Sequence, residues 1–368
     1  MAARRIDIPF HADIIVVGAG PGGTMLATLL ARAGKDVLLI ERQAIADKRK
    51  LCGGVILASG MRLLDSVHGK RFVKKLDGVH LQGMRVLYGE NETTIPYGAF
   101  ACPRENLDRL LAERYVKKRG LLRKGGLLVD KLDVRSVDEA AHEVLARDVW
   151  TGGIGRLDSD FRISYDTLVA ADGAASRIRA LVTGARPQTH ICFAAATEPL
   201  AGPPVLTQRT YSRIAGSCWH IPQGKQAVIG GLFLPEPTQV EPDEQKALIE
   251  AFATALGLPR PELRGAPVPT GTDICLRSAG GTYFVGDAAG LIEPALAAGI
   301  HLALTSAAAL AEDLCGGQRY EDLMAGTCAK QRAFAQNTLF PYLRLSLAVL
   351  RANEKKNQAE LEAKKKQP

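Results

Sequence analysis

Three glycines and one acidic residue near the N-terminus stand at a spacing that could do chemistry. Gly18, Gly20 and Gly23 form a GxGxxG pattern, and Glu41 follows 18 residues after the last of them. In such a pattern the first glycine permits a tight turn, the second lets backbone N–H groups approach a pyrophosphate, and the third allows close packing of a helix on a strand. The acid can accept hydrogen bonds from a ribose diol. The candidate nucleotide contacts in this segment are Gly18, Gly20, Pro21, Gly23, Glu41 and Arg42.

The elements that must position these residues can be read from the hydrophobic pattern. An apolar run over 13–17 precedes the glycines, a helical pattern that ends at Gly34 follows them, and a second apolar run over 36–40 leads to Glu41. Continuous apolar runs are typical of parallel strands buried on both faces. The N-terminus of the helix adds a positive potential for the pyrophosphate. The order strand, turn, helix, strand and acid therefore predicts a dinucleotide site.

Two later segments also end an apolar strand at an acidic residue. In YDTLVAADGAASRIR the strand ends at Asp172. In YFVGDAAG a strand over 282–285 leads to Gly286 and Asp287, and a long helix of small residues is expected to begin near Ala297.

The three segments together resemble the flavoprotein fold shared by p-hydroxybenzoate-hydroxylase-type monooxygenases and geranylgeranyl reductases. The resemblance implies FAD rather than NAD as the cofactor, with Asp287 at the ribityl chain. It also implies that the last helix directs its N-terminus at the isoalloxazine, where the positive end of the dipole stabilises the anionic reduced ring. The further residues assigned to FAD in this way are Asp172, Gly286, Asp287, Ala298, Gly299 and Ile300.

Two more segments resemble the geranylgeranyl reductases in particular. A Cys52-Gly53-Gly54 sequence follows the acid, and in that family the segment passes close to the flavin, which glycines allow by leaving the backbone bare. Cys52 is either a functional thiol or a small buried side chain. Arg104 resembles the arginine that begins a helix and reaches FAD, where its fixed charge could pair with the pyrophosphate. Its alternative is an ordinary surface arginine at a helix start.

A third segment matches the family only in part. Trp219 and Pro222 match a YxWxFP-like strand, but Ser217 stands for Tyr and Ile221 for Phe. The departure leaves the fold assignment intact and the substrate open. Trp219 either lines the pocket or fills the core of a sheet. The candidate catalytic residues are Cys52, Gly53, Gly54 and Trp219, and the basic residues 48–50 either hold a phosphate group or form a solvated loop.

These observations predict an α/β fold. A Rossmann-like FAD-binding domain, of the glutathione-reductase and p-hydroxybenzoate-hydroxylase type, is interleaved with a substrate domain built on a mixed or antiparallel β-sheet. Strands over 190–197 and 226–234 are expected in the substrate domain, which prolines divide into short strands. The expected bounds are 1–56, 102–185 and 279–315 for the FAD-binding domain, 57–101 and 187–278 for the substrate domain, and 316–368 for a C-terminal helical segment with a lysine-rich tail.

The amino-acid composition limits the kinds of binding partner that this protein is expected to have. The 368 residues are 46% hydrophobic and 23% charged, as in an ordinary globular protein of about two domains. A net charge of +8 favours anionic partners, but 5% aromatic residues argue against base stacking, so no nucleic acid is expected. The seven cysteines include no CxxC pair, which fits neither a zinc site nor a disulfide framework. No signal peptide is recognised, so a cytoplasmic location is expected. The apolar-basic stretch over 339–351 could dock on a membrane surface.

Three functions remain open on the sequence. The favoured one is reduction of a carbon–carbon double bond by hydride transfer from reduced flavin. The alternative is an NAD(P)H-dependent monooxygenase that hydroxylates an aromatic ring, in a small molecule or a protein residue, through a flavin C4a-hydroperoxide. The third is a non-catalytic flavin-binding assembly protein. A second nucleotide fold is absent from the sequence pattern, so NAD(P)H is expected to bind transiently in the cleft as electron donor. The expected substrate is a small molecule or a lipid, with a protein as the other possibility.

Overall fold

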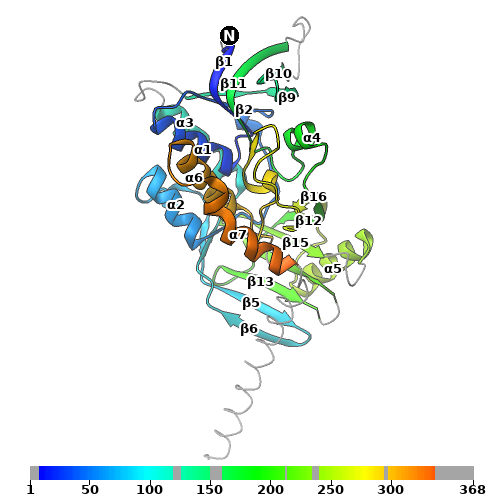
Figure 1. The fold of residues 1–368 in the computed structure, drawn as a ribbon. Coiled ribbons are helices and arrows are strands. Elements are labelled where there is room, and N and C mark those ends of the chain that lie inside the picture. The colour runs from blue at the N-terminus through cyan, green and yellow to red at the C-terminus, as the bar shows by residue number, and fades with distance from the viewer. Residues whose placement is uncertain are drawn as a thin grey trace, which may run out of the picture.

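Two large β-sheets form the framework of the protein and lie toward opposite ends of the molecule (Figure 1). The computed structural model describes residues 8–118, 126–149, 160–211, 214–233, 240–293 and 297–335. Among these residues no helix combines the length and the apolar character needed to cross a bilayer. The apolar-basic stretch 339–351 and the lysine-rich tail lie outside the described residues.

The first sheet carries the glycine-rich turn. Its strand order is β8-β2-β1-β11-β10-β9, with β17 beside β11. The parallel part consists of β8 (Gly126–Asp130), β2 (Val37–Glu41), β1 (His11–Val17), β11 (Asp160–Ala170) and β17 (Tyr283–Phe284). The strands β10 (Glu143–Asp148) and β9 (Leu132–Asp138) extend it in antiparallel order. Because β1 and β2 are parallel neighbours, their carboxyl ends place Gly18 and Glu41 at one edge of the sheet.

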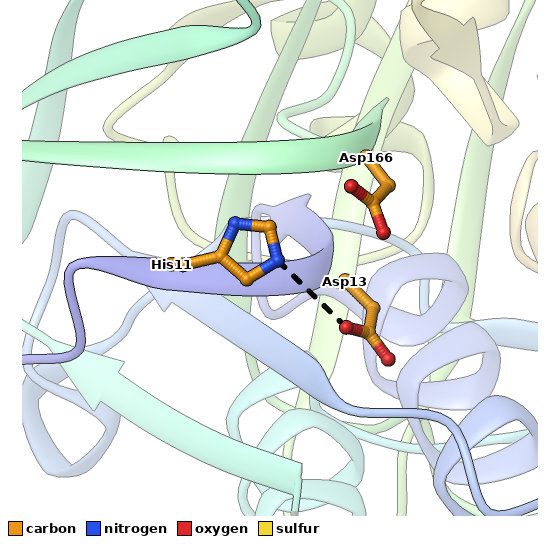
Figure 2. Close-up of side chains that lie close together, drawn as sticks. All are labelled: His11, Asp13 and Asp166. Carbon is orange, nitrogen blue, oxygen red and sulfur yellow. Dashed lines mark ion pairs between the residues drawn. The ribbon is translucent and has the colours of Figure 1, made fainter.

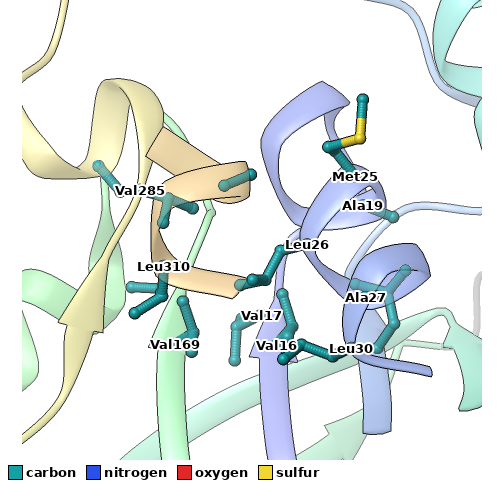
Figure 3. Close-up of a cluster of buried hydrophobic side chains, with 14 of the residues drawn as sticks. Val16, Val17, Ala19, Met25, Leu26, Ala27, Leu30, Val169, Val285 and Leu310 are labelled. Carbon is teal, nitrogen blue, oxygen red and sulfur yellow. The ribbon is translucent and has the colours of Figure 1, made fainter. Parts of the chain in front are cut away.

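Helix α1 (Pro21–Arg32) and helix α6 (Ile300–Leu314) pack side by side on this sheet (Figure 3). Figure 3 shows the resulting core, in which Leu26 of α1 and Leu310 of α6 lie over Val16 and Val169 of the sheet. Each such buried side chain stabilises the fold by about 1.5–3 kcal/mol. Helix α3 (Arg104–Lys118) lies beside α1. The apolar runs in β1 and β2 are thus explained by the burial of these two strands.

The second sheet forms the other wall of the molecule, with strand order β16-β12-β15-β14-β13-β5-β6. Helix α5 (Pro242–Ala255) covers its outer face through a cluster that includes Phe233, Ile249 and Phe252. The strands are β16 (Arg264–Pro269), β12 (Thr189–Thr197), β15 (Ala227–Phe233), β14 (Gly216–Pro222), β13 (Val205–Thr210), β5 (Gly83–Tyr88) and β6 (Asn91–Ile95).

Smaller elements connect the two sheets. A three-stranded sheet joins β3 (Val55–Leu57), β7 (Ala99–Ala101) and β4 (Val79–Leu81), and α2 (Ala58–His68) packs against α6. The remaining helices are α4 (Arg177–Thr183) and α7 (Tyr320–Ala335), with the short turns η1 (Ile45–Asp47), η2 (Val73–Lys75) and η4 (Gly286–Ala289).

The predicted α/β class and flavoprotein-type architecture are confirmed, but two elements differ from the sequence pattern. The strand expected over 282–285 is only Tyr283–Phe284, because the N–H of Thr282 donates to Ser278 Oγ at 2.9 Å. The last helix begins at Ile300 rather than near Ala297, because Ala297 has φ +51°, which no helical residue adopts. The domain bounds expected from the sequence stay a prediction.

Candidate active site

A cavity of about 1380 Å³ opens where the carboxyl edge of the first sheet faces the second sheet. Its walls bring together segments that are far apart in the sequence. Every residue predicted for the site lines it except Gly23: Gly18, Gly20, Pro21, Glu41, Arg42, Cys52, Gly53, Gly54, Arg104, Asp172, Trp219, Gly286, Asp287, Ala298, Gly299 and Ile300. The individual roles given to these residues remain predictions.

The glycine-rich turn has the geometry that its sequence predicts. Gly18 has φ +106°, and a Cβ there would collide with the backbone carbonyl of Ala171. Gly23 lies behind the turn, where a Cβ would collide with the carbonyl of Gly18, so its role is close packing of helix on strand. Gly20 is the N-cap of α1 and offers no side-chain hydrogen bond to the helix. The first turn of α1 can therefore serve an anionic pyrophosphate.

Glu41 is buried and already oriented at the end of β2. Its Oε2 accepts the N–H of Ala19 at 2.9 Å, and its Oε1 accepts the N–H of Gln43 at 3.0 Å. Lys48 Nζ lies 2.7 Å from the same Oε2 and 3.6 Å from Asp108 Oδ2. The sequence left two roles open for Lys48, phosphate binding or a solvated loop. In the structure Lys48 instead pairs with the carboxylates of Glu41 and Asp108 at the nucleotide site.

Arg104 is a buried residue of this site and not a surface arginine. Its Nε and a terminal nitrogen donate to the two carboxylate oxygens of Asp108 at 3.0 and 3.1 Å. Burial lowers the pKa of the guanidinium, but the charge of Asp108 outweighs it and the net shift is upward. The terminal nitrogen also lies 3.9 Å from the position that a Cβ of Gly20 would occupy. A permanent positive charge therefore stands beside the phosphate turn.

The Cys-Gly-Gly segment, residues 52–54 and called the strap below, lies against the second sheet. The N–H of Gly54 donates to Cys52 Sγ at 3.4 Å, and Gln223 Nε2 donates to the Cys52 carbonyl at 2.8 Å. A Cβ on Gly53 would come 2.6 Å from Ile221 Cδ1 and 4.0 Å from the Trp219 ring. The four candidate catalytic residues thus meet in one place, and Trp219 faces the cavity.

The two aspartates that follow strands have different surroundings. Asp172 accepts hydrogen bonds from Ser176 Oγ at 2.6 Å and from the N–H groups of Arg177 and Ile178 at 2.7 and 3.1 Å. Burial raises the pKa of Asp172, and these hydrogen bonds oppose the shift without cancelling it. Its carboxylate therefore holds the start of α4, and only the rest of the residue is open to a ligand.

Asp287 belongs to η4 and lies close to the start of α6. Its Oδ1 would be 2.8 Å from a Cβ on Gly299, the N-cap of α6. Lys50 Nζ lies 3.5 Å from its other oxygen and links the segment before the strap to this turn. Asp287 stays partly exposed, so it can accept hydrogen bonds from a polyol.

The inner face of the second sheet forms the remaining wall. Side chains of alternate residues point to the same face of a strand, so one residue in two lines the cavity. On β13 to β15 these are Leu206, Gln208, Ser217, Trp219, Ile221, Val228 and Leu232. Sequence reasoning missed Gln208 and Gln223. The period-two pattern through Trp219 could have indicated Gln223, whereas Gln208 needs the pairing of β13 with β14.

Other groups that could do chemistry lie away from this cavity. His220 and His301 do not line it, and burial lowers the pKa of both. His11, Asp13 and Asp166 gather at the surface where β1 pairs with β11 (Figure 2), with His11 Nε2 3.8 Å from Asp13 Oδ1. None of these five residues contributes to the candidate site.

The architecture of the nucleotide side fits FAD. Its glycine turn leaves no room for a Cβ, its helix N-terminus carries no side-chain cap, and its buried carboxylate stands at the end of the neighbouring strand. The glycine turn and the helix N-terminus suit a pyrophosphate, and the buried carboxylate suits a ribose. The cavity then continues past Asp287 and the start of α6 toward the apolar wall.

Comparisons with known proteins agree with this geometry. The model of the FAD binding domain family matches residues 11–339. Digeranylgeranylglycerophospholipid reductase 2 of Methanosphaera stadtmanae is 26% identical over 357 residues, which cover 91% of this chain and 83% of that protein. The 6-methylpretetramide 4-monooxygenase of Streptomyces rimosus is 26% identical over 343 residues, with coverages of 85% and 77%.

A solved structure has the same fold. The geranylgeranyl bacteriochlorophyll reductase-like protein of Thermoplasma acidophilum superposes with a TM-score of 0.67 at 20% identity, covering 92% of this chain and 86% of that one. Because the family model spans nearly the whole chain, and because the cavity carries the features that FAD needs, this chain belongs to the FAD-binding-domain family of FAD-dependent oxidoreductases.

Proposed function

We propose that this protein is an FAD-dependent reductase that saturates a carbon–carbon double bond in an apolar small molecule or a lipid. The observation that carries the proposal is the largely apolar wall of β13 to β15, which faces the strap at the end of the nucleotide cavity. The similarity to a digeranylgeranylglycerophospholipid reductase over most of both chains supports it.

The nucleotide half of the cavity would hold the cofactor through groups described above. The turn at Gly18 and the first turn of α1 would bind the pyrophosphate, with the charge of Arg104 beside them. Glu41 would accept hydrogen bonds from the ribose, and Asp287 from the ribityl chain. Reduced FAD bound in this way supplies a hydride.

The substrate half would orient the alkene and exclude water. Leu206, Trp219 and Ile221 offer apolar surface, and burial of an alkyl chain on it is favourable by about 25 cal/mol per Å². Saturation of the double bond needs a hydride at one carbon and a proton at the other. Cys52 is one of the two cysteines that line the cavity, with Cys192, and it would deliver the proton, while the bare backbone of Gly53 and Gly54 leaves room between wall and cofactor.

NAD(P)H would reduce the cofactor during a transient visit to the open cavity. The protein would act in the cytoplasm, which agrees with seven cysteines that are all free thiols.

A monooxygenase is the second candidate function. The 6-methylpretetramide 4-monooxygenase of S. rimosus has the same 26% identity to this chain and nearly the same coverage as the reductase. Under this alternative the same wall would hold an aromatic ring, and O₂ would be consumed.

The proposal is tested by an anaerobic single turnover. The FAD-loaded protein is reduced with dithionite and mixed with geranylgeraniol, and the masses of the products are measured by mass spectrometry. We expect one double bond to gain two hydrogens for each reduced flavin that is oxidised. A Cys52→Ser variant should bind FAD normally and turn over about 100-fold more slowly. The exposed Cys315→Ser is the matched control. Oxidation of the flavin only by O₂, with oxygen incorporated into an aromatic substrate, would favour the monooxygenase.

A further inference from the structure

A polar pair interrupts the apolar wall of the cavity. Gln208 on β13 and Ser217 on β14 line it among Leu206, Trp219 and Leu232. Ser217 pairs with Thr210 across the two strands, so Gln208 lies diagonally opposite Ser217 on the same face. No other polar side chain of β13, β14 or β15 in the described part of the chain lines the cavity.

The pair is deeply buried and incompletely hydrogen-bonded. Gln208 is 1% exposed and Ser217 4%. Gln208 Nε2 donates to Ser217 Oγ at 3.0 Å, and Gln208 Oε1 has no hydrogen-bond partner among the residues that the structure describes. An unpaired buried amide oxygen destabilises the protein, because it has lost its hydrogen bonds to water and gained none in return. A ligand that reaches the Gln208 amide from the cavity would supply the missing hydrogen bond.

The chemistry of the pair defines what such a ligand must offer. Gln208 Oε1 can accept a hydrogen bond, and the hydroxyl of Ser217 can still donate one. If the amide is turned over, Ser217 donates to it and the amide NH₂ group is left unpaired instead. In both orientations a single ligand group that donates and accepts hydrogen bonds satisfies the pair.

We propose that Gln208 and Ser217 are specificity-determining residues for a substrate that carries a hydroxyl, a primary amide or a lactam on an otherwise apolar body. A pure hydrocarbon segment at this point of the wall would leave the Gln208 amide unpaired. The small side chain of Ser217 stands where the resembling family has a tyrosine, and so leaves room for the group. This inference rests on the proposed function only in taking the cavity as the substrate site.

The neighbouring residue provides a matched control. Thr207 is 0% exposed, and its Oγ1 also has no partner in the described part of the chain. The side chain of Thr207 lies on the other face of β13, and Thr207 does not line the cavity. A substitution there disturbs the same strand without touching the proposed recognition group.

The experiment measures binding of octanamide and N,N-dimethyloctanamide to the FAD-loaded, oxidised protein by titration calorimetry. Dimethylation adds apolar surface and removes the donors, so apolar burial alone would favour the dimethyl compound. We expect the wild type to prefer octanamide about tenfold. Gln208→Leu should reduce the preference to about twofold or less, because it removes the acceptor of the ligand N–H. Ser217→Ala should weaken both compounds alike, because both keep the carbonyl to which Ser217 would donate, and Thr207→Val should keep the preference. Flavin absorption and thermal unfolding check that each variant is folded.

Three results would overturn the inference: no binding of octanamide, no preference in the wild type, or a preference that survives Gln208→Leu. The titration involves no hydride transfer. Failure of the proposed reductase activity would therefore appear as an unreduced alkene in the turnover assay, with the binding preference unchanged.

Discussion

At the scale of single residues, Gly54 is the position where the strap depends most on its residue type. Its φ is +64°, and a Cβ would collide with the carbonyl of Cys102. We expect Gly54→Ala to cost at least about 1–3 kcal/mol and to weaken FAD binding, because the strap must leave the wall of the cavity. The matched control is Gly98→Ala, since nothing lies within 4 Å of a Cβ there. Urea unfolding and FAD titration measure both effects, and equal stability of the two variants would contradict the account.

Cys102 gives a pH dependence whose sign can be worked out. Burial raises the pKa of this thiol to about 12 from its ordinary value of 9.0, so the folded protein keeps a proton that the unfolded chain loses above pH 9. Stability from this group is therefore complete below pH 9 and falls as the pH rises toward 12. Between pH 8 and pH 10 the loss is about 1.4 kcal/mol.

Unfolding measured at pH 8 and pH 10 tests this. Cys102→Ala should lose about 1.4 kcal/mol less than the wild type between the two pH values, although it is less stable at both. Replacement of the exposed Cys315 by Ala should leave the pH difference unchanged. An identical pH difference in Cys102→Ala and wild type would show that burial does not hold this thiol protonated.

At the scale of elements, α1 and α6 approach each other closely. This contact connects the glycine-rich turn before α1 with the start of α6, near Asp287. A Cβ on Gly22 would come 3.1 Å from the carbonyl oxygen of Ala303 and 3.4 Å from its Cβ. We expect Gly22→Val to separate the helices, with a loss of about 1–3 kcal/mol and of most FAD affinity. Gly326→Val in α7 makes the same change in a helix with open space around it. Calorimetric unfolding with and without FAD compares the two variants, and similar losses would argue against the packing role of Gly22.

The elements also show what the sequence could predict. The strands and the helix around Gly18 were predictable because burial on both faces makes their residues apolar throughout. The start of α6 was not, because the left-handed backbone of Ala297 breaks no residue-type pattern. Gln208 was not identified either, since its importance comes from a neighbour on another strand. Asp172 lines the cavity, but the commitment of its carboxylate to α4 depends on hydrogen bonds that spacing alone does not fix.

At the scale of the whole molecule, one ligand would connect the first sheet, the strap and α6, since residues of all three line one cavity. FAD that binds only the folded state adds about 2.7 kcal/mol when its free concentration is 100 times its Kd. Removal of FAD should therefore lower the melting temperature and the hydrogen-exchange protection of residues 52–54 and of the turn at Gly286. Protection lost only around Gly18 would mean that the cofactor does not extend through the cavity.

The oxidation of the reduced protein by O₂ tests the central claim most directly. FAD-loaded protein, reduced without oxygen, is mixed with O₂ in a stopped-flow spectrometer, with and without an apolar alkene. A reductase is predicted to return directly and slowly to the oxidised spectrum, and the alkene should oxidise the flavin even when O₂ is left out. A transient spectrum distinct from both the reduced and the oxidised flavin, with no oxidation by the alkene, would contradict the reductase and identify the cavity as that of a monooxygenase.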